Sequence, residues 1–147
     1  MRRRGIKLFI LSVLFLILTG CSKVGRETSV VRVGQKVIEV EVARTQQEHE
    51  RGLSKRMKLP PENGMFFVFT DRGQYSFWMK DMMFPLDFIW IDGDKVVEIT
   101  QDVPFPETGK NITTVTPAMP IDKVIEVNGG FINSANIHIG DKFEVLN

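Results

Sequence analysis

The only cysteine of the chain, Cys21, directly follows a short apolar segment near the N-terminus. Residues 8–19 (LFILSVLFLILT) form this segment, Gly20 separates it from the cysteine, and four basic residues precede it: Arg2, Arg3, Arg4 and Lys7. As a helix, these 12 residues rise only about 18 Å, well short of a hydrocarbon core of roughly 30 Å. The segment therefore predicts a transient signal helix rather than a stable membrane span.

The order Leu18-Thr19-Gly20-Cys21 resembles the lipobox of bacterial lipoproteins. The resemblance implies that residues 1–20 are removed as a signal peptide and that Cys21 receives a diacylglyceryl group, usually with a further acyl chain on the new amine. Two or more acyl chains anchor a protein stably, whereas one holds it only marginally. We therefore expect an extracytoplasmic lipoprotein of the cell envelope, with the membrane as its partner. The alternative is an uncleaved anchor with a buried, inert Cys21.

Removal of the signal peptide would leave 127 of the 147 residues without a free thiol, so the fold must be held by its core alone. All 18 acidic residues but only 15 of the 19 basic residues follow Cys21, which gives the mature chain a net charge of 15 minus 18, or −3. Such a domain lacks the basic footprint of a nucleic-acid partner. We expect a lipidated cysteine and polar tether at residues 21–29, followed by one domain over residues 30–147.

Short apolar runs separated by turn signals predict a β-rich domain. Gly34-Gln35 lies between residues 30–33 and 36–43, and Asp92-Gly93-Asp94 lies between residues 86–91 and 95–100, so each indicates a hairpin. Thr45 and Glu48 match a capping box that starts a helix to about residue 53. Further strands are expected at residues 65–69, 75–79, 112–115, 124–127 and 143–146. This pattern is typical of a compact antiparallel barrel or sandwich with one or two short helices.

The middle of the chain contains several separate motifs in a fixed order. They are Arg51-Gly52-Leu53, Arg56, Leu59-Pro60, Gly64-Met65-Phe66-Phe67-Val68-Phe69, Phe77-Trp78-Met79-Lys80, Pro85-Leu86-Asp87 and Gly140-Asp141. Together they resemble the uncharacterised prokaryotic family called domain of unknown function 192, over residues 36–146. The resemblance implies a small β-rich fold that is often exported. It implies no activity, because none is established for that family.

Asp87 stands in an apolar strand pattern, Leu86-Asp87-Phe88-Ile89-Trp90-Ile91, in which both faces of the strand are apolar. An ionised carboxylate there needs a cation or several backbone N–H donors, or else its pKa rises. Candidate cations are Arg51, Arg56 and Lys80. An ion pair that ties the helix to the sheet is the structural interpretation, and a ligand-binding or catalytic role is the functional one.

A candidate binding surface follows from the density of polar groups around these motifs. Arg51, Arg56, Trp78, Lys80 and Asp87 combine guanidinium groups, an ammonium, an indole and a carboxylate in apolar surroundings. Arginine offers a planar fork for a carboxylate or phosphate, and tryptophan offers a flat face for a sugar ring or a cation. We expect any functional surface to lie where these residues meet.

Enzyme motifs are absent from this sequence, which has no Gly-x-Ser-x-Gly elbow, no phosphate-binding Gly-rich loop and no His-Glu-x-x-His. Acid/base pairs of Asp87 with Glu126 or Asp141 leave no sequence signature, so a small hydrolase acting on an envelope polymer stays an alternative. His49 and His138 are isolated and have no metal-ligand spacing. Thioethers suit Cu(I), so a copper-binding lipoprotein is a further alternative, although core packing explains the methionines more simply; the three closest together are Met79, Met82 and Met83.

The sequence therefore favours a lipid-anchored exported β-domain that acts as a non-enzymatic binding or envelope-interaction module. No cofactor and no metal are expected. The hydrolase would require a polar cleft with two carboxylates, the binding module an apolar-rimmed surface, and the copper protein three converging thioether sulfurs.

Overall fold

The computed structural model describes residues 26–107 and 111–146, so Cys21 and the expected signal peptide lie outside the described residues. Within them, the elements are β1 (Thr28–Val33), β2 (Lys36–Ala43), α1 (Gln46–Arg51), β3 (Asn63–Gly73), β4 (Phe77–Trp78), β5 (Leu86–Asp92), β6 (Lys95–Val103), β7 (Thr114–Val115), β8 (Ile121–Asn128), α2 (Phe131–Ser134) and β9 (Phe143–Val145). No helix in these ranges is long and apolar enough to cross a membrane.

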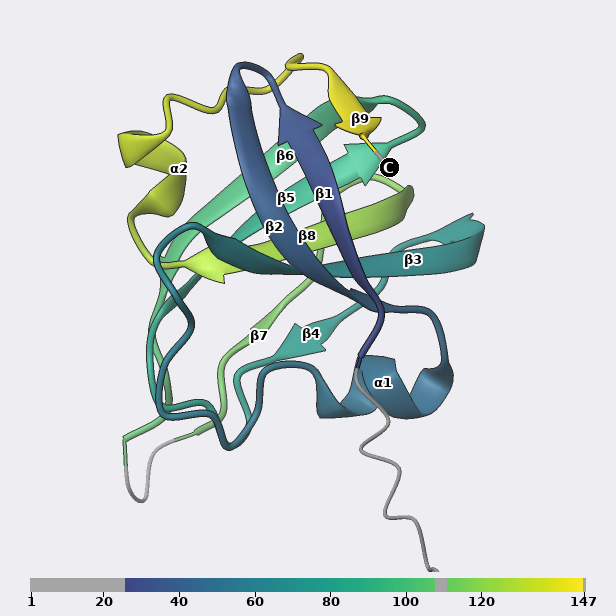
Figure 1. Cartoon of the computed structure of the whole chain (residues 1–147). Coiled ribbons are helices and arrows are strands. Elements are labelled where there is room, and N and C mark those ends of the chain that lie inside the picture. The colour runs from purple at the N-terminus through teal and green to yellow at the C-terminus, as the bar shows by residue number, and fades with distance from the viewer. Residues whose placement is uncertain (1–25, 108–110, 147) are drawn as a thin grey trace, which may run out of the picture.

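Seven of the strands form one curled sheet in the order β6-β5-β8-β3-β2-β1-β9 (Figure 1). The two edges of this sheet meet at one end, where the Val96 N–H donates to the Asp141 carbonyl at 2.9 Å and the Gly140 N–H donates to the Val96 carbonyl at 2.8 Å. The sheet is therefore a partly closed barrel, which confirms the expected β-rich fold. The short strands β4 and β7 pair with each other outside it.

The expectation of a wholly antiparallel sheet is wrong at one pair, because β2 and β3 run parallel, with Val40 opposite Gly64 and Val42 opposite Phe66. Parallel neighbours need a long crossover connection, and here α1 and the loop after it return the chain to the start of β3. This connection lies across the outer face of the sheet, where it covers apolar side chains.

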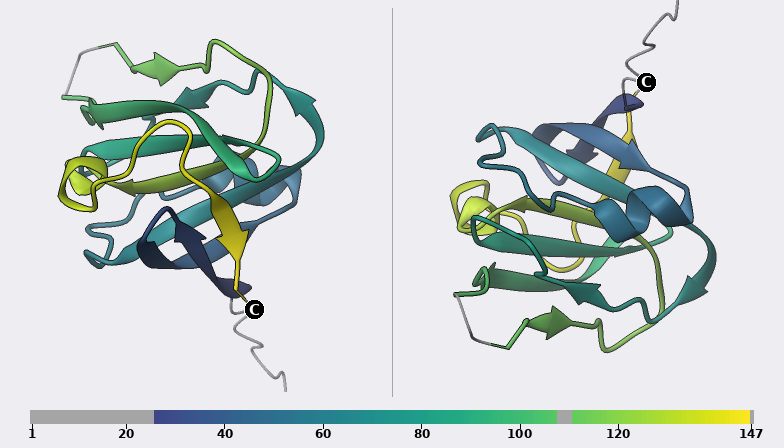
Figure 2. Two further views of the ribbon diagram at one scale, coloured as in Figure 1. Left: turned by 90° about the horizontal axis from the view of Figure 1, so that it is seen from above. Right: turned by 90° about the horizontal axis from the view of Figure 1, so that it is seen from below.

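Side chains of the central strands alternate between two apolar clusters. On β5, Ile89 and Ile91 face the inside of the barrel, whereas Phe88 and Trp90 face outward. The outer cluster lies under α1 and the β4–β7 pair, while α2 and the C-terminal segment lie on the other side of the sheet (Figure 2). The continuous apolar run of β5 thus reflects burial on both faces.

Local signals located most elements correctly. The hairpins β1–β2 and β5–β6 are confirmed, with Val33 opposite Lys36 and Asp92 opposite Lys95. Residues 28 and 29, which were assigned to the tether, belong to β1 instead. The expected strand at residues 75–79 is regular only at Phe77–Trp78, and α2 has no signal that located it in the sequence.

Candidate functional site

Helix α1 is fixed at its start by the capping box that the sequence predicted. The Glu48 N–H donates to the Thr45 hydroxyl at 3.3 Å, and Glu48 Oε2 accepts from the backbone N–H groups of Thr45 and Arg44, both at 2.9 Å. The backbone hydrogen bond from Thr45 is the main cause that lowers the pKa of Glu48 to about 2. These bonds set the position of the helix above the sheet.

A cavity of about 360 Å³ opens between α1, the Phe69–Trp78 segment and the outer face of β8. We call it the aromatic pocket, because the rings of four Phe, Tyr and Trp residues line it: Phe69, Tyr75, Phe77 and Trp78. The Phe69 and Tyr75 rings stack with centroids 3.7 Å apart, and Phe77 meets Phe69 edge to face at 6.3 Å. The walls are therefore mostly apolar, with flat ring surfaces that suit an apolar or cationic group.

Glu126 on β8 lies at the base of the aromatic pocket. Its neighbours across the sheet are Met65 on β3 and Phe88 on β5, so the carboxyl group has apolar surroundings. Only 6% of the residue is exposed, and Oε2 is buried without a hydrogen-bond partner among the described residues. Burial raises the pKa of Glu126 from its ordinary value of 4.5 to about 8. The carboxyl group is therefore mostly protonated at neutral pH.

Gly52, directly after α1, lines the aromatic pocket together with this carboxyl group. A Cβ atom at this position would lie 3.9 Å from Glu126 Oε2 and 3.6 Å from the ring of Phe67. Gly52 has φ 46° and ψ −135°, a conformation that residues other than glycine rarely adopt. The Arg51-Gly52-Leu53 motif thus ends the helix and places no side chain between position 52 and Glu126.

His49 also lines the aromatic pocket, and its ring packs against Phe69 and Phe67 with centroid distances of 4.7 and 5.8 Å. Its Nε2 lies 3.0 Å from the Ala43 carbonyl. Because a carbonyl only accepts, Nε2 carries a hydrogen in this contact. The hydrogen bond and the two ring contacts together fix the position of the His49 ring.

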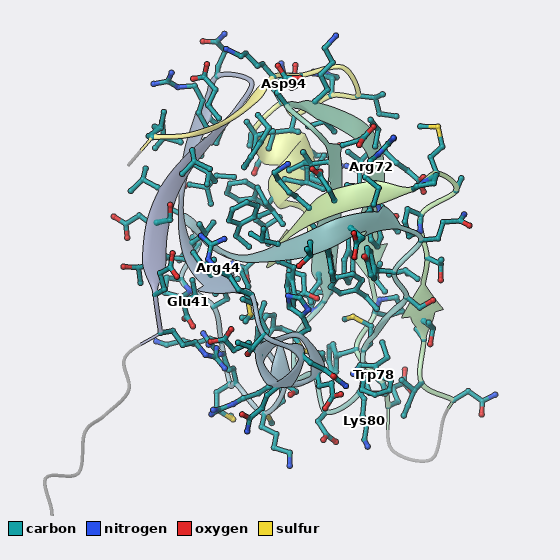
Figure 3. The ribbon with its side chains drawn as sticks, turned by 90° about the vertical axis from the view of Figure 1, so that its right-hand side faces the viewer. Glu41, Arg44, Arg72, Trp78, Lys80 and Asp94 are labelled. Carbon is teal, nitrogen blue, oxygen red and sulfur yellow. The ribbon has the colours of Figure 1, made fainter. Side chains whose placement is uncertain are left out.

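Three of the five residues of the expected binding surface meet at the mouth of the pocket. Arg51, Trp78 and Lys80 line both the aromatic pocket and a neighbouring polar hollow. Trp78 is 55% exposed, and Lys80 Nζ lies 5.9 Å from the centre of its ring. Figure 3 labels both residues, in the lower part of the view. Neither cation forms a salt bridge within the described residues. The mouth is thus cationic and aromatic.

Arg56 lines only the neighbouring hollow, together with Lys55 and Asp81. Its two terminal nitrogens each donate to Glu41 at 2.6 Å, and Arg26 donates to the same carboxylate at 2.9 Å. This bidentate pair fixes the loop after α1 to β2. Arg56 is therefore already occupied and positions the loop.

The assignment of Asp87 to the candidate surface is wrong. Asp87 is fully buried on the inner side of β5 and lines no part of the aromatic pocket. Its carboxylate accepts backbone N–H bonds from Asp102 at 2.8 Å, Ile132 at 2.9 Å and Gly130 at 3.2 Å. These donors satisfy the carboxylate in place of the expected cation, so Asp87 fixes the β6 end and the start of α2.

The acid/base pairs considered for Asp87, with Glu126 or with Asp141, do not form in the pocket either. Asp141 accepts from the His138 N–H at 2.8 Å in the turn before β9, and neither Asp87 nor Asp141 lines the pocket with Glu126. The methionines also have separate environments, since Met79 and Met82 are buried in the outer cluster whereas Met83 is 47% exposed. The described residues contain no group of three His, Cys, Asp or Glu side chains that could hold a metal ion.

Sequence reasoning named Glu126 only as a possible acid/base partner of Asp87, and of the rings of the pocket it selected Trp78 but not Phe69, Tyr75 or Phe77. A signal was present at Glu126, because a carboxylate interrupts the apolar run Val124-Ile125-Glu126-Val127 as Asp87 interrupts its own. The two residues differ in their tertiary hydrogen bonds. Backbone N–H groups donate to the Asp87 carboxylate, whereas none of the described residues donates to Glu126 Oε2.

Two solved structures are similar to the chain over most of its length. One is a proposed transcription regulator from Sinorhizobium meliloti 1021, with a TM-score of 0.76, 26% identity and coverage of 84% of this chain and 97% of that chain. The other is a protein of unknown function from Novosphingobium aromaticivorans DSM 12444, with a TM-score of 0.74, 32% identity and coverage of 84% and 89%.

No curated protein matches the chain. Residues 29–145 match the family DUF192, which is described as an uncharacterized ACR. The match includes α1, every strand from β2 to β9 and all the residues that line the aromatic pocket. The chain therefore belongs to the DUF192 family.

Proposed function

We propose that this chain is a lipid-anchored, exported binding protein that takes a small ligand, or one group of a larger one, into the aromatic pocket. The observation that carries the proposal is the pocket itself, with aromatic walls, one buried carboxyl group and unpaired cations at the mouth. Ligand sites are commonly apolar cavities with a few placed polar groups. Glu126 is the deep polar group here, and Arg51 and Lys80 are the outer ones.

The position of the pocket supports a role close to the membrane surface. Arg26 Nη2 donates to the Gly52 carbonyl at 3.5 Å, and Arg44 pairs with Glu27, so the first described residues lie beside α1. Only five chain steps separate Arg26 from Cys21, a reach of at most about 18 Å. A lipid on Cys21 would therefore keep the pocket within this reach of the membrane surface.

The residues that line the pocket favour a binding function over the hydrolase and copper-binding alternatives. An acid/base hydrolase needs two carboxyl groups that flank the scissile bond, but the second carboxylate of the pocket, Glu50, is exposed and accepts from Gln46 at 2.9 Å. A copper site needs converging sulfurs, but Met83 is 47% exposed whereas Met79 is fully buried. The name of the Sinorhizobium neighbour suggests regulation of transcription, which the net charge of −3 expected for the mature chain disfavours.

The anchoring is tested by mass spectrometry of the membrane fraction. We expect an N-terminal peptide that starts at acylated Cys21, and a Cys21→Ser variant that is not acylated. Recovery of an intact segment from Met1 through Cys21 in the mature protein would contradict the anchor.

The binding role is tested with 1-hexanol, a neutral apolar probe, added to the full chain in detergent. Nuclear magnetic resonance should show a saturable shift of the exposed Trp78 indole N–H, with empty micelles as the blank. The absence of any saturable shift with this probe and with charged probes of the same length would contradict the proposed site.

A further inference from the structure

The least explained group in the molecule is the Glu126 carboxyl. Oε2 is buried and unpartnered, and the side chain forms no hydrogen bond or salt bridge within the described residues. Leaving a buried polar atom unpaired costs free energy, so such groups require an explanation. Glu126 and Gly52 both line the aromatic pocket, so a ligand group bound there can supply the missing donor.

On the basis of the binding function proposed above, we infer that the ligand is an organic amine whose ammonium group meets the Glu126 carboxyl inside the aromatic pocket. An ammonium group supplies N–H donors and a positive charge. The described residues directly around the Glu126 carboxyl group supply neither of them. Nearby rings strengthen the match, because their faces attract cations. Phe69, Tyr75 and Phe77 all line the pocket.

Proton balance gives the inferred complex a measurable property. The free Glu126 carboxyl is mostly protonated at neutral pH, since burial raises its pKa to about 8. An entering ammonium keeps its own proton and favours the carboxylate, so the carboxyl proton leaves to solvent. Binding of an amine at pH 7 therefore releases close to one proton, about the fraction of Glu126 that is protonated beforehand.

The charges at the mouth of the pocket predict which kind of group the outer end of the ligand carries. Arg51 and Lys80 are exposed there without salt-bridge partners in the described part of the chain. Their charges oppose a second cation and favour an anion. The inferred ligand class is thus an amine with an apolar middle and a neutral or anionic outer end.

The test uses four molecules of matched length: hexylamine, 1-hexanol, hexanoate and 6-aminohexanoate. Titration calorimetry of the full chain in detergent, in two buffers with different ionisation heats, measures affinity and proton release together. Hexylamine should bind at least about tenfold more tightly than 1-hexanol, with proton release, and 6-aminohexanoate should bind at least as well as hexylamine. Glu126→Gln should remove both the preference and the release, whereas the exposed control Glu62→Gln should keep both.

Proton release from neighbours must be separated from that of Glu126. The other titratable or charged groups around the pocket are His49, Glu50 and Arg51 on α1, Tyr75 before β4, and Lys80 after it. Release that persists in Glu126→Gln would assign the proton to one of these groups and overturn the inference.

The outcomes distinguish this inference from the function on which it rests. Equal binding of 1-hexanol and hexylamine to the wild-type chain, or tighter binding of hexanoate, would overturn the amine while the pocket remains a binding site. Absence of saturable binding for all four molecules would overturn both proposals. Because the comparison within the wild-type chain decides the result, it does not depend on how well Glu126→Gln folds.

Discussion

Gly52 lies next to Glu126, so that a Cβ atom at position 52 would be 3.9 Å from Oε2. One residue that lacks a side chain and one buried carboxyl group thus lie side by side in the lining of the aromatic pocket. The first belongs to the Arg51-Gly52-Leu53 motif, and the second lies more than 70 residues later on β8. The relationship connects a sequence motif of the family with a site that no local pattern describes.

Gly52→Ala should weaken ligand binding and lower the free energy of unfolding by about 1–3 kcal/mol, because an L side chain at this φ and ψ is strained. The matched control is Gly93→Ala, where φ is +61° and nothing lies within 4 Å of the added Cβ. Both variants should lose stability in chemical denaturation, and only Gly52→Ala should lose affinity for hexylamine. Equal affinities in the two variants would show that position 52 does not limit access to Glu126.

The buried Glu126 should make stability fall as pH rises. Its folded-state pKa is raised from 4.5 to about 8, so the folded chain binds more protons than the unfolded chain between these values. The contribution of Glu126 to the free energy of unfolding therefore decreases from about pH 4.5 to pH 8 and is fully lost above pH 8. Glu126→Gln cannot ionise and should exceed the wild type by a few kcal/mol at pH 9.

Denaturation of both proteins at pH 5, 7 and 9 measures this difference. The variant retains the other charged or titratable groups around the pocket, which are the half-buried His49 and Tyr75 and the exposed Glu50, Arg51 and Lys80. The difference between the two curves isolates Glu126. A difference that does not change with pH would mean that the carboxyl group has a partner in solution.

Sequence patterns correctly predicted the elements that depend on residues close together in the chain. The capping box at Thr45 and the two hairpin turns depend on residues within a few positions of each other, and all three form as expected. The parallel pairing of β2 with β3 depends on where a long connection returns, so alternation within the strands could not reveal it.

The residues of the candidate site were likewise predicted only in part. Arg51, Trp78 and Lys80 were correctly expected to meet, because their two motifs are rich in polar groups among apolar residues. Asp87 and Glu126 looked alike in sequence, as single carboxylates in apolar strands. Their roles differ because the start of α2 donates to Asp87, and the position of α2 depends on tertiary contacts.

Asp87→Asn should destabilise the fold without affecting the pocket directly. An amide in place of the carboxylate presents an N–H₂ group to at least one of three backbone N–H donors, at a cost of about 3 kcal/mol. The control Asp94→Asn, in the exposed turn after β5, should change stability by less than about 0.5 kcal/mol. Chemical denaturation measures both, and a neutral effect of Asp87→Asn would contradict the structural role assigned to this residue.

The two tryptophans should separate binding from stability. Trp78 is 55% exposed at the mouth of the pocket, whereas Trp90 is fully buried and donates from Nε1 to the Thr100 hydroxyl at 2.9 Å. Trp78→Ala should therefore cost little stability but weaken hexylamine binding roughly tenfold, since the indole face and its contact with Lys80 are lost. Trp90→Ala removes a large core side chain and should cost roughly 3–5 kcal/mol.

Unfolding free energies and calorimetric affinities of the two variants give a direct comparison. At a temperature where Trp90→Ala is still folded, its affinity for hexylamine should stay closer to that of the wild type than the affinity of Trp78→Ala does. Trp90 does not line the pocket, and its ring lies 5.5 Å from that of Phe77, which does, so its loss affects the ligand only indirectly. If Trp78→Ala instead destabilised the chain strongly and kept full affinity, the exposed indole would be a structural residue and the mouth of the pocket would lie elsewhere.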